Sequence, residues 1–131
     1  MDNFDFSKFK DSVSESLIRH KSILDVITKL QETNSKINRA VVKSVTSCGC
    51  IEIDCKKQNL PDNITFGEIS EYMDNHIRGS LCDICKEKIE QELGDHMFYI
   101  VSLCNSLGID LEDVLKKEYR KINTLGKYSL F

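Results

Sequence analysis

Hydrophobic residues recur at three- and four-residue steps over most of the chain, which is the spacing of one face of an α-helix. The first such stretch begins at a capping box formed by Ser12 and Glu15 and continues to about Ser47, where Gly49 is a suitable stop. This pattern predicts a long N-terminal helix, with a bend over residues 33–35 because Asn34 is a polar residue on the apolar stripe. The stripe contains Leu17, Ile23, Ile27, Leu30, Ile37, Val41 and Val45.

An irregular segment follows, over residues 48–63. Within it Ile51–Ile53 alternates apolar and acidic residues, which favours a short extended piece, and the single proline of the chain favours a loop. A second, short helix is expected from Thr65, which makes a capping box with Glu68, to a stop at Gly79.

Two further helices are predicted in the last third of the chain. One begins at Ser80 or Leu81 and ends at Gly108, and the other begins after a cap at Asp110 and ends near Gly126. Four helices with short links predict an all-α fold, a four-helix bundle with a long N-terminal helix. The apolar residues of the last helix are expected to face the core: Leu111, Val114, Leu115, Tyr119 and Ile122.

Composition and charge narrow the class of protein. A chain of 131 residues can bury a core of its own, and we predict one domain over residues 1–131. The net charge is only −3, without a basic stripe or an acidic block, so nucleic acid is not an expected partner. No apolar run is long enough for a membrane span, and the first residues lack the features of a signal peptide. These features predict a cytoplasmic protein with no membrane partner.

Two pairs of carboxylates, each spaced by one helical turn, are the first candidate chemistry. Glu92 and Asp95 lie at the edge of the apolar stripe of the third predicted helix, and Glu68 and Glu71 lie on the second. An ionised acid near a core needs a positive partner, which is either a divalent metal or a basic side chain such as Lys88, four residues before Glu92. The first pair also has ordinary alternatives, namely helix capping for Glu68 and an exposed helix charge for Glu71.

Residues 92–118 read ELGDHMFYIVSLCNSLGIDLEDVLKKE, and this stretch resembles the MazG-like nucleotide pyrophosphohydrolases of the all-α NTP pyrophosphatase superfamily. In that family an E-x-x-E on one helix and an E-x-x-D on the next hold Mg²⁺ against a nucleoside triphosphate, which is cleaved to the monophosphate and pyrophosphate. The resemblance implies Glu68, Glu71, Glu92 and Asp95 as ligands of Mg²⁺ or Mn²⁺, with Glu71 or Glu92 nearest to the attacking water. It also implies a homodimer or homotetramer.

The resemblance also places phosphate-binding residues on the last helix. The family usually has a lysine and an asparagine together there and an arginine one turn later, whereas this chain has Arg120, Lys121, Ile122, Asn123 and then Lys127. The candidates for contact with the triphosphate are the basic residues of this helix: Lys116, Lys117, Arg120, Lys121 and Lys127, of which we select Lys117, Lys121 and Lys127.

Six cysteines form a second constellation, which the resemblance does not explain. In a reducing compartment, closely spaced cysteines more often bind metal or fill a core than form disulfides. Zn²⁺ prefers four sulfur or nitrogen ligands in a tetrahedron, and the expected ligands come from Cys48, Cys50, His76, Cys82 and Cys85. A redox-active C-x-x-C and a set of small buried residues are the other two interpretations.

Two classes of function therefore follow from the sequence. The first is a Mg²⁺-dependent nucleoside triphosphate pyrophosphohydrolase, which the two intact acidic motifs favour. The second is a non-catalytic MazG-like protein whose Cys/His zinc site serves structure or partner binding, which the extra cysteines and the altered basic pattern of the last helix favour.

Overall fold

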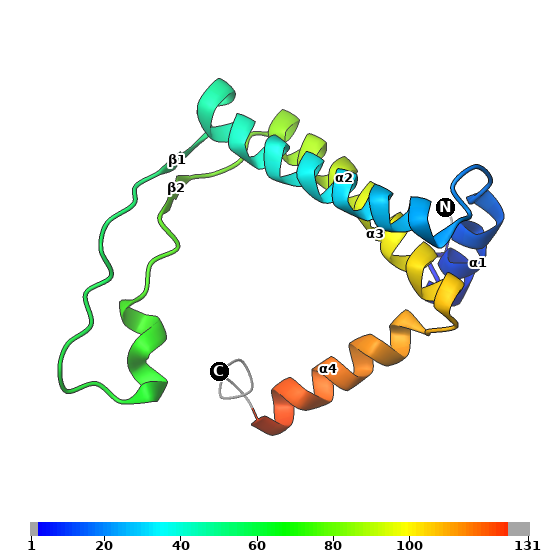
Figure 1. Ribbon diagram of the computed structural model, residues 1–131. Helices are drawn as coiled ribbons and strands as arrows, with labels where there is room; N and C mark the ends of the chain where they lie inside the picture. The colour runs from blue at the N-terminus through cyan, green and yellow to red at the C-terminus, as the bar shows by residue number, and fades with distance from the viewer. Residues whose placement is uncertain (1–2, 126–131) are drawn as a thin grey trace. The chain divides into compact units, whose positions relative to one another are not determined.

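The structure is a computed structural model that describes residues 3–125, and most of these residues are helical (Figure 1). The α-helices are α1 (Phe6–Ser16), α2 (Ile23–Lys43), α3 (Asp83–Leu107) and α4 (Leu111–Leu125). The remaining elements are a π-helical turn η1 (Ser44–Cys48), a 3-10 helix η2 (Phe66–Tyr72) and two strands, β1 (Ile51–Ile53) and β2 (Ile77–Gly79). The predicted all-α class is confirmed.

The chain divides into two compact units, which are described separately. Within the described residues, the helical unit comprises 3–35 and 93–125, and the cysteine unit comprises 36–92. Helices α2 and α3 each run through both units. The helical unit therefore holds α1, α4 and one part of α2 and α3, whereas the cysteine unit holds the other parts and everything between them.

A small core in the helical unit joins α1 to α3 and to the start of α4. Val13 and Val101 are 2% and 1% exposed, and they form one cluster with Cys104 and Leu111. Aromatic rings of α1 and α3 pack against this cluster and add to the apolar area that the core buries. A hydrogen bond from Asn105 Nδ2 on α3 to a backbone carbonyl of α1, 3.2 Å long, fixes the same contact.

The prediction of one long helix from Ser12 onward is wrong in its first part. Helix α1 ends at Ser16, and α2 begins only at Ile23. The N-cap of α1 is Asp5, whose carboxylate accepts the backbone N–H of Ser7 at 2.8 Å. As a separate helix, α1 buries Val13 in the core. Helices in proteins gain most of their stability from such packing, so burial of Val13 outweighs the extension of α2 toward the N-terminus.

The bend predicted over residues 33–35 is also absent, because α2 is continuous from Ile23 to Lys43. The hydroxyls of Thr33 and Ser35 donate to the backbone carbonyls four residues before them, at 2.8 and 3.0 Å. These polar side chains are therefore satisfied within the helix and do not interrupt it.

The predicted helix from Thr65 to Gly79 is wrong over most of its length. Only η2 is helical, it is a 3-10 helix, and the side chain of Thr65 makes no capping hydrogen bond. The end of this segment is β2, which pairs antiparallel with β1 so that Ile51 lies opposite Gly79. The extended piece predicted at Ile51–Ile53 is confirmed.

Two local features explain why the segment before α3 is extended. The side chains of Asp74 and Asn75 accept the backbone N–H groups of His76 and Ile77, which are the short-range bonds that compete with a helix. Gly79 has a φ of +83°, and a Cβ there would lie 2.7 Å from the carbonyl oxygen of Cys50. Strand pairing at this point therefore requires glycine.

The predicted end of the third helix and the predicted start of the fourth agree with the structure, and the predicted stop near Gly126 lies outside the described residues. Asp83 stands in the first turn of α3, and Asp110 caps α4 by accepting the backbone N–H of Glu112 at 3.0 Å. Gly108, with a φ of +68°, ends α3 in the left-handed conformation that favours glycine.

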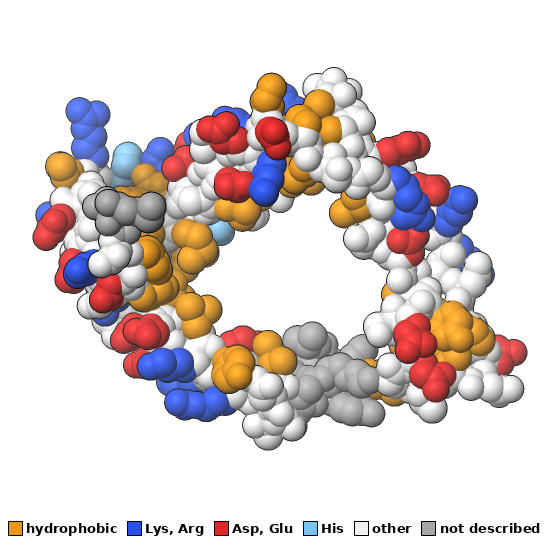
Figure 2. Space-filling model, turned by 180° about the vertical axis from the view of Figure 1, so that it is seen from behind, with side chains coloured by type: hydrophobic (Ala, Val, Ile, Leu, Met, Phe, Trp, Pro, Cys, Tyr) orange, Lys and Arg blue, Asp and Glu red, His pale blue; other side chains and the backbone are white. Residues whose placement is uncertain are grey.

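Helix α4 keeps most of its apolar face exposed, contrary to the expectation that this face is inward. Leu111 is buried, but Val114, Leu115, Tyr119 and Ile122 are exposed. Figure 2 shows hydrophobic side chains along one edge of α4 and charged side chains along the other. Within residues 3–125, this amphipathic helix buries its apolar face only at its first turn.

Replacing Val101 with alanine tests the core of the helical unit. We expect the free energy of unfolding to fall by about 1–3 kcal/mol, because the change removes buried methyl groups and leaves a cavity. Thermal unfolding followed by circular dichroism measures the change. Val42→Ala removes the same atoms from a side chain that is 55% exposed and should cost less than about 0.5 kcal/mol. Equal costs in the two variants would contradict the assigned core.

Candidate functional site

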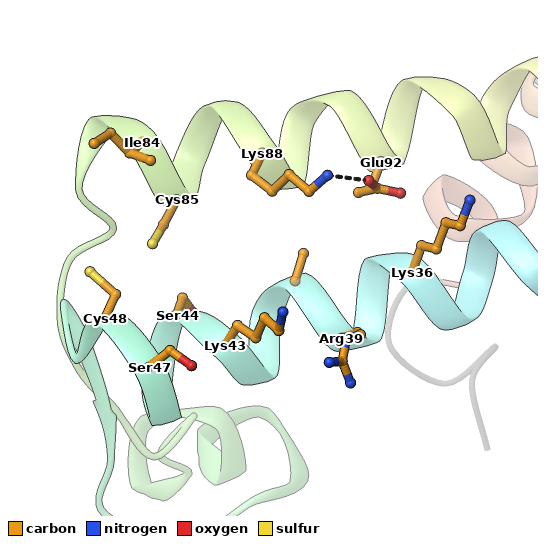
Figure 3. A pocket seen from close by; sticks show the side chains of 11 residues that line it. Lys36, Arg39, Lys43, Ser44, Ser47, Cys48, Ile84, Cys85, Lys88 and Glu92 are labelled. Carbon is orange, nitrogen blue, oxygen red and sulfur yellow. Dashed lines mark ion pairs between the residues drawn. The ribbon is translucent and has the colours of Figure 1, made fainter.

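A groove of about 470 Å³ lies in the cysteine unit between the last turns of α2 and the first turns of α3 (Figure 3). Helix α2 contributes Lys36, Arg39 and Lys43 to its lining, and α3 contributes Lys88 and Glu92. The lining therefore includes four basic side chains and one carboxylate. The groove also has an apolar part, which includes Ala40, Ile84 and the sulfur-bearing side chains Cys48 and Cys85.

The spacing along α2 explains how one helix lines the groove. Lys36, Arg39, Ala40 and Lys43 follow steps of three and four residues, so they share one face of the helix. Ala40 and Ser44 are buried at this face, and the Ser44 hydroxyl is satisfied by donating to the backbone carbonyl of Val41. Small residues at these positions leave space between the two helices, while the long basic side chains reach solvent.

Glu92 is the most unusual side chain of the groove. It is 7% exposed, and its Oε1 accepts a hydrogen bond in an ion pair from Nζ of Lys88 at 2.9 Å (Figure 3). The ion pair with Lys88, which the spacing of four offered as the ordinary alternative to a metal, is therefore present. The other oxygen, Oε2, is buried and has no hydrogen-bond partner among the described residues. A buried carboxylate oxygen without a partner is costly, so it is a site where a cation or a donor group of a ligand would bind favourably.

Two basic side chains that line the groove, Arg39 and Lys43, are exposed. Within the described part of the chain, neither Arg39 nor Lys43 forms an ion pair. Guanidinium and ammonium groups in this state bind carboxylate or phosphate oxygens through charge-assisted hydrogen bonds. The groove as a whole therefore favours an anionic ligand, with one acidic point at Glu92.

The structure does not gather the four carboxylates of the predicted metal site. Glu68 and Glu71 are exposed on η2, and Asp95 is exposed one helical turn after Glu92 on α3. Among residues 3–125, no group close enough to hold a metal ion includes any of these acids. The partnerless oxygen of Glu92 is a suitable ligand for a hard cation such as Mg²⁺. The exposed positions of Glu68 and Glu71 provide no further evidence for a metal there.

The basic residues predicted on the last helix lie on exposed positions of α4. Lys116 and Lys121 each pair with a glutamate of the same helix, at 3.9 Å from Glu112 and 3.1 Å from Glu118. Lys117 and Arg120 are exposed as well. Lys127 lies outside the described residues.

Four cysteines form the second candidate centre. The Sγ atoms of Cys48, Cys50, Cys82 and Cys85 all lie within 4.8 Å of one another, and those of Cys48 and Cys82 are 3.8 Å apart. All four are free thiols. The backbone N–H of Cys85 donates to the Cys82 sulfur at 3.4 Å and lowers the pKa of the Cys82 thiol to about 7. The Cys82 side chain in turn raises the pKa of Cys85 to about 12.

His76, which was predicted as a possible ligand, and the nearby Cys55 are not part of the group. Nε2 of His76 lies 2.9 Å from the backbone oxygen of Lys56 and 3.3 Å from the side-chain nitrogen of Gln58. Cys55 is exposed and is not one of the four clustered cysteines. The candidate centre thus has four sulfur atoms and no imidazole.

The groove also contains site residues that the sequence does not single out, namely Lys36, Arg39 and Lys43. Their signal was present, because three basic residues at steps of three and four define a stripe on one helix face. In a chain with 18 basic residues that signal is weak. Only the position of α3 shows that the stripe lies opposite a buried carboxylate.

Comparison with known proteins identifies the family. The model of the MazG nucleotide pyrophosphohydrolase domain matches residues 62–128, slightly more than half of the chain. This match includes Glu92, Asp95 and all of α4. Neither a curated protein nor a solved structure matches the chain. The family resemblance predicted from residues 92–118 is therefore confirmed, and the chain belongs to the MazG nucleotide pyrophosphohydrolase family.

Proposed function

We propose that this protein hydrolyses nucleoside triphosphates to the monophosphate and pyrophosphate in the groove between α2 and α3. Members of its family act on nucleotides. The observation that carries the proposal is the buried Oε2 of Glu92, which has no partner among the described residues and lies in a groove lined by four basic side chains. A triphosphate with a bound divalent cation offers positive charge to the carboxylate and negative charge to the basic residues.

In this proposal the basic residues of α2 bind the phosphates. Arg39 presents a planar fork of donors that suits two phosphate oxygens at once, and Lys43 and Lys36 act as point charges. The candidates on α4, Lys117 and Lys121, are proposed as phosphate-binding residues on the family resemblance alone. The charges of Lys88 and Glu92 offset each other in their ion pair. The three basic residues of α2 then leave the groove with a net positive charge, which attracts the negatively charged triphosphate.

The carboxylates of α3 would hold the metal. Mg²⁺ in such sites keeps several waters and binds one or two carboxylates together with substrate phosphates, so Glu92 and Asp95 are a sufficient protein contribution. When bound, Mg²⁺ or Mn²⁺ screens the phosphate charge and increases the acidity of a bound water. Glu68 and Glu71 are proposed, on the family motif alone, as the second pair of ligands.

Hydrolysis in this site needs one proton acceptor. Water attacks the α-phosphorus, the bond from that phosphorus to the bridging oxygen breaks, and pyrophosphate leaves. Glu92 or Glu71 would take the proton of the attacking water. Glu92 is the better placed of the two, since it lies in the groove whereas Glu71 is exposed on η2.

The proposal includes an assembly and a location. The exposed apolar face of α4 suits a homodimer or homotetramer, because a monomer rarely leaves such a face in water. No helix within residues 3–125 has the length and apolar composition that crossing a membrane requires. We place the protein in the cytoplasm, where thiols stay reduced and nucleoside triphosphates are available.

The alternative is a non-catalytic member of the family in which the cysteine group serves structure or partner binding. The four clustered cysteines are compatible with this alternative and do not favour it over the enzyme.

Pyrophosphate release from a panel of common and modified nucleoside triphosphates, with Mg²⁺ or Mn²⁺, tests the proposal. We expect turnover of at least one triphosphate, no turnover in the presence of EDTA, and release of pyrophosphate without orthophosphate. No turnover across the panel would contradict the enzyme. Together with about one zinc per chain, it is the result expected of the alternative.

A further inference from the structure

The four clustered cysteines come from two turns that lie next to each other in the cysteine unit. Cys48 and Cys50 flank Gly49, whose φ of +78° and N–H bond to the carbonyl of Ser44 close the turn after α2. Cys82 directly precedes α3, and Cys85 lies in its first turn. Pairing of β1 with β2 holds the chain segments beside these turns together, and it depends on the close approach of Gly79 to the Cys50 backbone.

The distances suit one metal ion and do not suit a disulfide. A tetrahedron with zinc–sulfur bonds of about 2.3 Å has sulfur–sulfur edges of about 3.8 Å. The Sγ atoms of Cys48 and Cys82 are 3.8 Å apart, and all four sulfurs fall within 4.8 Å of one another. A disulfide requires a separation of about 2.05 Å. The hydrogen bond from the Cys85 N–H to the Cys82 sulfur also favours a thiolate there, which is the form that binds metal.

We propose that Cys48, Cys50, Cys82 and Cys85 bind one Zn²⁺ in a closed, four-sulfur structural site that joins the end of α2 to the start of α3. Four sulfur ligands in a tetrahedron are typical of zinc, and with four protein ligands no position remains for a substrate. Binding releases the protons of the thiols as the thiolates coordinate the metal. His76 is not a ligand, because its ring bonds to the loop around Lys56.

This zinc site would also shape the groove. Two of the four ligands, Cys48 and Cys85, line the groove that carries Glu92, and Figure 3 shows their sulfur atoms pointing toward one another at one end of it. Fixing these two side chains fixes the distance between α2 and α3 at that end. This consequence rests on the proposed function of the groove, whereas the zinc site itself does not.

Elemental analysis and cobalt substitution of the full chain test the proposal without nucleotide. We expect about one zinc per chain as purified. After removal of the metal under reducing conditions, titration with Co²⁺ should give the absorption bands of tetrahedral cobalt with four thiolate ligands, and one equivalent of Zn²⁺ should abolish them. Absence of zinc together with absence of these bands would overturn the proposal, and iron in place of zinc would overturn the choice of metal.

Variants identify the ligands. Cys82→Ser with Cys85→Ser should lose the zinc and lower the melting temperature, and Cys55→Ser, an exposed cysteine outside the group, should retain both. If the double variant does not fold, Cys48→Ser alone should shift the cobalt bands to those of three thiolates, and an unshifted spectrum would remove Cys48 from the site.

Nucleotide binding by the zinc-free protein tests the effect of the metal on the groove. Weaker nucleotide binding after zinc loss supports that effect. Zinc binding by a protein that binds no nucleotide would leave the metal site intact and contradict only the proposed function.

Discussion

Glu92→Gln should lower the rate of pyrophosphate release by at least about 100-fold, which is the scale of losing a positioned proton acceptor or a metal-binding carboxylate. Glutamine has nearly the same shape, so the groove keeps its volume but loses the negative charge that a cation requires. The oxygen that would contact the cation is the buried Oε2 of Glu92, because Oε1 is already paired with Lys88. Steady-state kinetics with the best triphosphate of the panel measure the effect.

Stability should change little in this variant, so lost activity can be separated from unfolding. Lys88 is 61% exposed in its side chain, and water can solvate its ammonium group when the charge of residue 92 is removed. Circular dichroism is therefore expected to show unchanged helix content. Glu90→Gln is the matched control, since Glu90 is an exposed glutamate on the same helix and does not line the groove. Full turnover in Glu92→Gln would remove this residue from the mechanism.

The same assay decides the role of the first acidic pair. If Glu68 and Glu71 hold metal as the family motif implies, Glu71→Gln should lower turnover as strongly as Glu92→Gln does. If the protein needs only the carboxylates of α3, Glu71→Gln should retain most of the activity, in keeping with its exposed position on η2.

Reversing two basic charges of the groove is expected to have the second large effect. In the double variant Arg39→Glu with Lys43→Glu, the Kd for a non-hydrolysable triphosphate with Mg²⁺ should rise by about 100-fold or more. Hydrogen bonds to charged groups contribute about 1.5–3 kcal/mol each, so the loss of two bonds alone corresponds to a change of this size. Calorimetry at two salt concentrations measures it, and the wild-type affinity should fall more steeply with salt than that of the variant.

The control for this variant must carry the same change in net charge. Lys57→Glu with Lys86→Glu reverses two exposed lysines of the cysteine unit that do not line the groove, and its Kd should stay within a few-fold of the wild type. Comparable weakening in both variants would show that the charge of the whole protein, not the groove, attracts the nucleotide. Weakening only by Lys117→Glu with Lys121→Glu would move the phosphate site to α4.

The sequence by itself determined the parts of this protein that depend on local signals. The end of α3 and the start of α4 followed from Gly108 and from the cap at Asp110, which act within a few residues of themselves. The family followed from a contiguous stretch, residues 92–118, and the pairing of Lys88 with Glu92 followed from a spacing of four on one helix. Such signals require no knowledge of what the helix packs against.

Only the tertiary structure decided the features that depend on distant segments. The break before α2 comes from burial of Val13 with Val101, 88 residues away along the chain, and the loss of the second predicted helix comes from pairing of β2 with β1. The capping pattern at Thr65 could not indicate that pairing, because local propensity is weaker than a tertiary contact.

The candidate sites divide in the same way. The sequence identified Glu92 and the four cysteines by residue type and spacing, but it also admitted His76 as a ligand and could not place Lys36, Arg39 and Lys43. Whether a cysteine joins a cluster, and whether a basic stripe lies opposite a carboxylate, depends on how α2 and α3 lie side by side in the cysteine unit. That arrangement is set by packing and by the paired strands, and no single stretch of sequence encodes it.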